Sequence, residues 1–202
     1  TSAMAEEVLQ KAEAYDVLAI GPGLGRDAET QRFVKEILTR WRKPIIVDAD
    51  ALYAVKEMEI DLARCPGQLI LTPHVGEFAH LTGRTAAEAE RERIDGAIAF
   101  AMEQGVTLVL KGMPTVIAAK DGFAYVNVTG NPGMATGGMG DTLTGIIAAL
   151  AGQEMDPEPA AICGVYLHGL SGDFLARETP VGYTASDVAR MVPRAREMVT
   201  GD

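Results

Sequence analysis

Short apolar runs rich in β-branched residues alternate along this chain with longer segments of helical periodicity. The runs are residues 17–20, 45–47, 69–71 and 106–110. Each is too short for a helix, and its continuous apolar character is typical of a strand buried on both faces. Strands that alternate with helices form a mainly parallel sheet covered by helices, so we predict the α/β class. A chain of 202 residues fits one domain, which we place over residues 1–202.

The helical segments and one hairpin complete the predicted order. We expect helices over residues 28–41, 86–104, 141–151 and 157–177, and a last one from Thr184 or Ser186. The segment 86–104 reads as one long amphipathic helix, with Gly105 placed to end it. Two strand-like runs, 115–119 and 123–128, flank Asp121-Gly122, a dipeptide typical of tight turns. This pair therefore predicts an antiparallel hairpin.

Composition excludes several classes of protein. The net charge of −10 is spread along the chain, which argues against a surface that collects nucleic-acid phosphates. No apolar run approaches the length of a membrane span, and the first residues lack the pattern of a signal peptide. The two cysteines, Cys65 and Cys163, form no disulfide framework, which fits a reducing compartment. We therefore expect a cytoplasmic protein that contacts neither nucleic acid nor membrane.

The glycine-rich stretch from Gly130 to Asp141 is the strongest candidate for a binding site. Its glycines leave backbone N–H groups unshielded. A helix begins at or just after the stretch, and the unpaired N–H groups and positive dipole end of that helix favour an anion such as phosphate. A purely structural turn is the alternative. Asp141 can be a helix N-cap, or, beside a bound phosphate, the base that takes a proton from an attacking hydroxyl.

Other polar or glycine residues follow the predicted strands, where ligands collect in doubly wound sheets. The turn Gly21-Pro22-Gly23-Leu24-Gly25 has the place of a nucleotide loop, but it lacks dinucleotide-fold spacing and can be a tight connection only. Lys111 can meet a phosphate or be a solvated lysine at a strand end. Asp48 and Asp50 can hold Mg²⁺ through water, although capping of the next helix is the simpler explanation for Asp50.

Two histidines have competing interpretations. His74 and Glu77 lie three residues apart, which permits metal ligation, ligand contact or capping at a helix start. No second His or Cys lies nearby, so structural zinc is not expected. His168 lies in an apolar helical stretch, and we interpret it as a packed or hydrogen-bonded histidine outside the site.

Taken together, six segments resemble one family, the ADP- or ATP-dependent NAD(P)H-hydrate dehydratases of the ribokinase-like superfamily. The segments are AIGPGLG, PIIVDADAL, LTPHVGEF, LVLKGMPTVI, NPGMATGGMGDTLTG and VYLHGLSGD, and they occur in the family's order over nearly the whole chain. The resemblance implies a three-layer α/β/α fold. It also implies a repair reaction, in which ADP or ATP with Mg²⁺ drives loss of water from hydrated NADH or NADPH.

The resemblance also implies roles for particular residues. Asp141 would be the catalytic base acting on the hydrate hydroxyl, and Gly138 to Gly140 would form the anion hole for the moving phosphate. The nucleotide-binding residues would be Lys111, Gly112, Met113, Pro114 and Thr115, with Gly140. The substrate-binding residues would be Gly23, Gly25, His74 and Asp141. No residue identifies the metal ligands, and the sequence leaves open the choice between ADP and ATP and between NADH and NADPH hydrate.

One departure from the family concerns the start of the chain. The family's domain normally begins earlier, with strands and an alanine- and glycine-rich helix that are absent before Thr1. Because missing strands would expose edges and apolar surface, we expect a fragment, or a segment supplied by another chain. The family's frequent N-terminal hydrate epimerase domain is not seen either. We expect a homo-oligomer, with a tetramer as the first hypothesis.

Two other functions remain open at this point. A small-molecule kinase of the same superfamily would have a similar loop and base, because both reactions begin by phosphorylating a hydroxyl. A nucleotide-binding regulatory protein without turnover would need the sheet and the glycine loop but no base, so Asp141 counts mildly against it.

Overall fold

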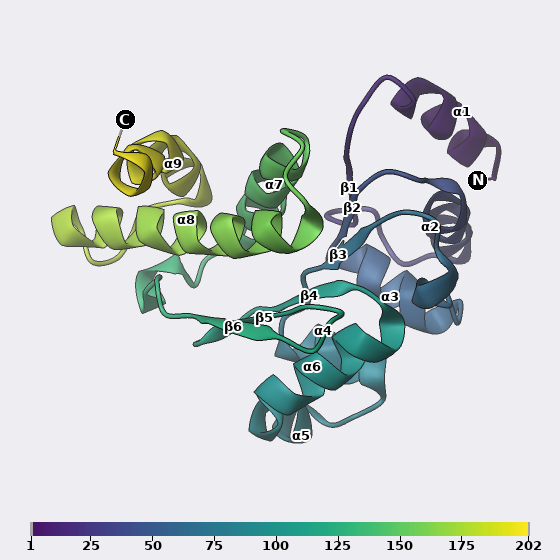
Figure 1. Cartoon of the computed structure of the whole chain (residues 1–202), viewed down its shortest axis with the longest axis horizontal. Helices are drawn as coiled ribbons and strands as arrows, with labels where there is room; N and C mark the ends of the chain where they lie inside the picture. The colour runs from purple at the N-terminus through teal and green to yellow at the C-terminus, as the bar shows by residue number, and fades with distance from the viewer. Residues whose placement is uncertain (1, 202) are drawn as a thin grey trace.

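The computed structural model of the chain describes residues 2–201, and within them six strands form one sheet (Figure 1). The strands are β1 (Leu18–Ile20), β2 (Ile45–Val47), β3 (Leu69–Leu71), β4 (Thr107–Leu110), β5 (Thr115–Ala118) and β6 (Ala124–Asn127). The helices are α1 (Ser2–Ala12), α2 (Ala28–Arg40), α3 (Asp50–Glu57), α4 (Val75–Thr82), α5 (Ala86–Arg91), α6 (Arg93–Gln104), α7 (Met139–Ala151), α8 (Pro157–Glu178) and α9 (Ala185–Thr200). Short 3-10 turns lie at η1 (Leu62–Arg64) and η2 (Pro132–Met134).

The strands lie in sequence order across the sheet. The first four are parallel, with Ile45 opposite both Leu18 and Leu69, so their carboxyl ends meet at one edge. β5 runs antiparallel to β4, and β6 runs antiparallel to β5. The predicted mainly parallel sheet and its hairpin are confirmed.

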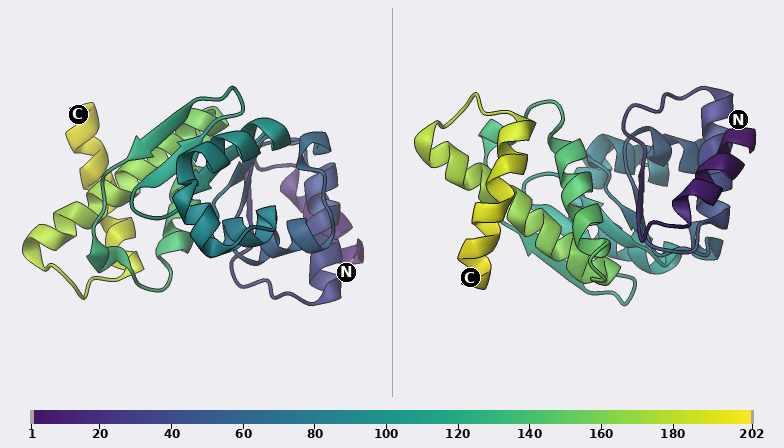
Figure 2. Two further views of the ribbon diagram at one scale, coloured as in Figure 1. Left: turned by 90° about the horizontal axis from the view of Figure 1, so that it is seen from below. Right: turned by 90° about the horizontal axis from the view of Figure 1, so that it is seen from above.

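Successive side chains of the central strands point to opposite faces, as a strand requires. On one face Ile45, Val47, Leu69 and Leu71 join a core with helices α2, α3, α4 and α6. On the other face Ile46, Ile70, Val109 and Ile117 pack against α7 and α8. The two groups of helices enclose the sheet between them. In Figure 2 the group with α4 and α6 lies in front of the sheet in the left view, and α7 and α8 lie in front of it in the right view. Helices on both faces explain why β2 and β3 are apolar at every position, and they confirm the three-layer arrangement.

The expected single helix over residues 86–104 is wrong. The structure has α5 and α6, separated at Glu92, whose φ of −104° and ψ of 28° interrupt the helix. The break lets Arg93 turn its side chain into the protein, where 8% of the residue is exposed. Gly105 ends α6 in the left-handed conformation, as expected.

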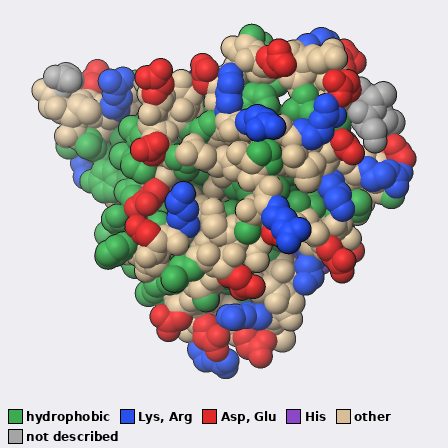
Figure 3. All heavy atoms as spheres, turned by 45° about the vertical axis from the view of Figure 1, so that its right-hand side comes forward, with side chains coloured by type: hydrophobic (Ala, Val, Ile, Leu, Met, Phe, Trp, Pro, Cys, Tyr) green, Lys and Arg blue, Asp and Glu red, His purple; other side chains and the backbone are tan. Residues whose placement is uncertain are grey.

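Charged side chains of both signs are interspersed over the face drawn in Figure 3. A single-sign surface of the kind that binds nucleic acid is not seen on this face. Among residues 2–201, no helix has both the length and the apolar character needed to cross a membrane.

Candidate active site

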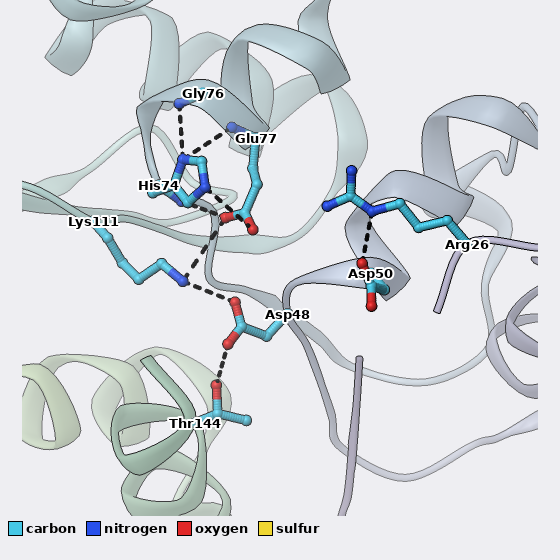
Figure 4. Close-up of polar contacts among 8 residues, drawn as sticks. All are labelled: Arg26, Asp48, Asp50, His74, Gly76, Glu77, Lys111 and Thr144. Atoms are coloured by element: carbon cyan, nitrogen blue, oxygen red, sulfur yellow. Dashed lines mark hydrogen bonds and ion pairs between the residues drawn. The ribbon is translucent and has the colours of Figure 1, made fainter. Parts of the chain in front are cut away.

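A buried polar network joins the carboxyl ends of β2 and β4 to α7 (Figure 4). The Asp48 carboxylate follows β2 and is 1% exposed. It accepts hydrogen bonds from Lys111 Nζ at 2.9 Å and from Thr144 Oγ1 at 2.9 Å. Lys111 Nζ also lies 3.8 Å from Glu77 Oε2. The interpretation of Lys111 as a solvated lysine is therefore wrong, because its charge is held between two carboxylates.

The Lys111 amino group lies next to the first turn of α7. A Cβ built on Gly140 would lie 3.4 Å from Lys111 Nζ and 3.8 Å from Asp48 Oδ2. The first N–H groups of a helix lack partners within it and attract anions. A lysine ammonium and a helix N-terminus thus lie next to each other, an arrangement that favours an anion such as phosphate.

Replacing Asp48 by Asn should lower the free energy of unfolding by about 2 kcal/mol, because Lys111 would keep its charge in a mostly buried place without a full counter-charge. The Lys111 side chain is 21% exposed, so the loss is less than for a fully buried pair. Urea unfolding of Asp48→Asn measures it. Asp61→Asn removes the exposed pair with Arg64 and should change stability little. Equal losses in the two variants would contradict the importance of the buried network.

Asp141 lies in the first turn of α7 but does not cap it. The N-cap is Gly138, in the left-handed conformation with φ of 82° and no side-chain cap hydrogen bond. The interpretation of Asp141 as an N-cap is therefore wrong. Its side chain is exposed, and within residues 2–201 its carboxylate makes no hydrogen bond or ion pair. The carboxylate is free to accept a proton from a ligand.

A large cavity of about 630 Å³ opens beside this helix start. Its wall is formed by residues 111–115, 126–132, Met134, Ala135, Met139, Gly140, Leu143, Val165, His168 and Gly169. All the residues expected to bind nucleotide, from Lys111 to Thr115 and Gly140, are among them. The exposed apolar side chains of Met113, Val126 and Val128 line the same cavity. The volume and the apolar wall with a few polar groups are typical of a small-molecule site.

Arg93 shapes the loop that follows β4, and sequence reasoning missed it. Its Nη1 donates to the carbonyl oxygens of Lys111 and Pro114, each at 3.2 Å. Gly112 has a φ of 150°, and a Cβ there would lie 2.5 Å from the guanidinium. A signal was present, because Arg93 shares with Ala97 and Ala101 the four-residue spacing of the buried face of α6.

Asp173 in α8 holds the start of the glycine-rich stretch. Its carboxylate accepts from Gly130 N at 2.9 Å and from Asn131 Nδ2 at 3.0 Å. Asn131 Oδ1 in turn accepts from Gly133 N and from the Tyr183 hydroxyl. The loop is thus fixed by side chains from the C-terminal helices and their connection.

His168 lies in the wall of the large cavity, although sequence reasoning left it outside the site. Its imidazole is hydrogen-bonded to the Met139 backbone, so the expected hydrogen-bonded histidine is confirmed. Its Nε2 is buried without a partner in the described part of the chain. Burial lowers the pKa of His168 from 6.5 to about 4, with a smaller contribution from the Lys111 charge. The imidazole is therefore neutral near pH 7.

The lowered pKa of His168 predicts a pH-dependent stability. In the unfolded chain the His168 imidazole takes up a proton below about pH 6.5. In the folded protein it does so only near pH 4. The folded state therefore has its full stability with respect to this group above pH 6.5. It loses stability as the pH falls from 6.5 toward 4, because protonation of His168 favours the unfolded chain. Unfolding free energy should be about 2 kcal/mol lower at pH 5 than at pH 7 from this group. Urea unfolding at pH 7 and pH 5 measures this fall in unfolding free energy. His168→Gln should not show it, whereas the control His80→Gln should show it as the wild type does. An equal fall in the wild type and both variants would contradict the assignment to His168.

His74 and Glu77 form a capping box at the start of α4. His74 Nδ1 accepts from the N–H groups of Gly76 and Glu77, and Glu77 Oε2 accepts from His74 N at 2.7 Å. The capping interpretation is confirmed. Because Nδ1 is an acceptor, the neutral ring carries its proton on Nε2, which lies 3.5 Å from Glu77 Oε1.

Asp50 does not cap α3, whose N-cap is Ala49, so the simpler explanation offered for this residue is wrong. Its carboxylate instead accepts from Gly25 N at 3.0 Å and from Arg26 Nε at 2.7 Å. Hydrogen bonding by Arg26 lowers the pKa of Asp50 below its ordinary value. Gly23 lies in the same turn, with φ of 72° and open space where a Cβ would be. The turn is thus fixed to α3 through Asp50.

The carboxylates near Lys111 fit Mg²⁺ only in part. Residues 2–201 contain no cluster of three or more His, Cys, Asp or Glu side chains able to enclose a metal. Asp48 and Glu77 lie 2.9 Å and 3.8 Å from Lys111 Nζ, and Mg²⁺ characteristically keeps several waters and binds one or two carboxylates with substrate phosphates. Glu77 fits that kind of site best, because both Asp48 oxygens already accept hydrogen bonds and Asp50 is paired with Arg26.

Comparison with known proteins decides the family. The sequence profile of the NAD(P)H-hydrate dehydratases matches residues 1–194. The chain belongs to the NAD(P)H-hydrate dehydratase family. A bifunctional NAD(P)H-hydrate repair enzyme, Nnr, from Moorella thermoacetica is 52% identical over 173 residues, which are 86% of this chain and 33% of that enzyme.

Solved structures agree with the family and the fold. An ADP/ATP-dependent NAD(P)H-hydrate dehydratase from Bacillus subtilis, co-crystallised with ATP/Mg²⁺, has a TM-score of 0.84 at 37% identity, over 92% of this chain and 65% of that one. A ribokinase-like superfamily protein from Enterococcus faecalis has a TM-score of 0.80 at 32% identity, over 96% of this chain and 68% of that one. The hydrate dehydratase fold of this chain is therefore ribokinase-like. The chain spans 33% of the length of the bifunctional relative and 65% of the B. subtilis enzyme.

Proposed function

We propose that this chain catalyses the ADP- or ATP-dependent dehydration of hydrated NADH or NADPH, which restores the reduced cofactor. The observation that carries the proposal is the placement of Lys111 and the α7 N-terminus beside the large cavity, whose wall contains residues 111–115. The family relationship and the nucleotide dependence of the B. subtilis enzyme support it.

The proposed first step is phosphorylation of the hydrate. Asp141 accepts the proton of the C6 hydroxyl as the hydroxyl oxygen forms a bond to the terminal phosphorus of the nucleotide. The bond between that phosphorus and its bridging oxygen breaks, and the shortened nucleotide leaves. Positioned N–H groups of Gly138, Met139 and Gly140 and the Lys111 ammonium stabilise the charge that develops on the moving phosphoryl group, each N–H contributing a few kcal/mol.

The second step eliminates phosphate. The C6–oxygen bond breaks as the ring nitrogen donates its electron pair, and the departing phosphate takes up a C5 proton, which restores the reduced nicotinamide. His168 is neutral beside the cavity and adds no positive charge there. Mg²⁺, held mainly by the nucleotide phosphates with Asp48 and Glu77 nearby, would neutralise phosphate charge. Gly23, Gly25 and His74 would contact the hydrate.

The test is the recovery of reduced-nicotinamide absorbance when purified protein is mixed with NADH hydrate or NADPH hydrate, Mg²⁺ and ATP or ADP. We expect recovery that requires both protein and nucleotide. Failure of both hydrates with both nucleotides would contradict the proposal. We also propose a cytoplasmic location, where the reduced cofactors are used, and a homo-oligomer, which analytical ultracentrifugation would test.

A further inference from the structure

A second, smaller cavity lies between the β1–α2 turn and helices α3 and α4, next to the His74 side of the site. Its volume is about 230 Å³, and it is lined by Arg26, Ala49, Leu52, Tyr53, His74, Gly76, Glu77 and His80. Sites for whole drug-sized ligands usually exceed about 300 Å³. The small cavity therefore has room for one group of a dinucleotide and not for the whole molecule.

Arg26 is held rigidly at one side of the small cavity. Its Nε donates to Asp50 Oδ1 at 2.7 Å, and its Cζ lies 4.7 Å from the centre of the Tyr53 ring. The Tyr53 ring also stacks on His80, with ring centres 4.7 Å apart and planes 1° from parallel. Tyr53 thus already packs against both Arg26 and His80.

The groups left free around this cavity are hydrogen-bond donors. Neither Nη of Arg26 has an acceptor within residues 2–201, and Figure 4 shows the guanidinium turned toward the space between Arg26 and His74. The Asp50 oxygens already accept from Gly25 N and Arg26 Nε, and Glu77 Oε2 accepts from His74 N. His74 Nε2 lies 3.5 Å from Glu77 Oε1, so the free donors are those of Arg26. Its two Nη groups form a planar fork that matches an anion with several oxygens.

We propose that Arg26 binds a phosphate group of the hydrated dinucleotide in the small cavity. This inference rests on the proposed function, because it makes the cavity part of the hydrate site next to Gly25 and His74. Two sources supply the same chemistry: the 2′-phosphate, which NADPH hydrate carries and NADH hydrate lacks, and the pyrophosphate that both carry.

Arg26→Gln tests the inference, with Arg32→Gln as the matched control. Arg32 is an exposed arginine of α2 that pairs with Glu29, away from the small cavity. We would measure the KM for both hydrates and, independently of turnover, the binding of NADPH and NADH by nicotinamide fluorescence. Loss of one charge-assisted contact from a partly exposed arginine should weaken binding about tenfold. Arg26→Lys keeps the charge without the fork and should show a smaller loss.

The pattern of losses separates the two sources. Weaker binding of NADPH and a higher KM for its hydrate alone assigns the 2′-phosphate to Arg26; equal losses for both dinucleotides assign the pyrophosphate. In either case the KM for ATP should stay at its wild-type value, and loss of the partly exposed Arg26–Asp50 pair should lower the thermal midpoint only slightly. Unchanged binding of both dinucleotides by Arg26→Gln would overturn the inference. Absence of hydrate turnover in the wild-type protein would instead contradict the proposed function.

Discussion

Asp141→Asn should lower the rate of hydrate dehydration by about a hundred- to ten-thousandfold, because a positioned general base contributes on this order. Asn has nearly the same shape but cannot take the hydroxyl proton. The carboxylate makes no contact within residues 2–201 that holds the fold, so stability and ATP affinity should change little. Initial rates at saturating hydrate and ATP, with nucleotide binding measured by calorimetry, give both quantities.

Asp95→Asn is the matched control. Asp95 is also an exposed aspartate at the third position of a helix, α6, and it does not line the large cavity. Its replacement should leave the rate at the wild-type value. A rate for Asp141→Asn within tenfold of wild type would mean that another group takes the proton.

Gly21→Ala should lower the free energy of unfolding by about 3 kcal/mol or more, because it combines a steric clash with a strained backbone. Gly21 has a φ of 136°, and a Cβ there would lie 1.6 Å from the carbonyl oxygen of Asp48. The chain leaving β1 thus passes directly over the chain leaving β2. Relief of the clash would displace Asp48, and with it Lys111 and Thr144, so activity should fall as well.

Gly23→Ala provides the comparison within the same turn. Gly23 has a φ of 72°, but no atom lies within 4 Å of the added Cβ. Only backbone strain remains, so the cost should be about 1 kcal/mol. Urea unfolding of the two variants measures the difference. Equal losses would show that the close approach to Asp48 has no energetic consequence.

The sheet was predictable because buried parallel strands leave a plain signal in the sequence. The runs 45–47 and 69–71 are apolar at every position, since both faces are covered by helices. The Asp121-Gly122 turn likewise indicated the hairpin between β5 and β6. The break between α5 and α6 was missed because no Gly or Pro marks it, and it accompanies the burial of Arg93 against the loop 18 to 21 residues further along the chain.

The site was predictable where one motif carries the chemistry and not where distant residues meet. The glycine-rich stretch and Lys111 were found from their own sequence context. Asp48 pairs with Lys111, 63 positions along the chain, and with Thr144, 96 positions along the chain, so no local sequence pattern could reveal these contacts. His168 was set aside because a histidine in an apolar helix usually packs in the core; the structure places it in the cavity wall. The roles of Asp141, Gly138, Gly140, Gly23, Gly25 and His74 stay predictions.

The most direct test of the central claim is the stoichiometry of a single reaction mixture of NADH hydrate, ATP, Mg²⁺ and purified protein. NADH would be followed by absorbance, and ADP and inorganic phosphate by chromatography and a colorimetric assay. We expect one ADP and one phosphate for each NADH formed. Consumption of ATP with a stable phosphorylated product and no free phosphate, or recovery of NADH without ATP consumption, would contradict it.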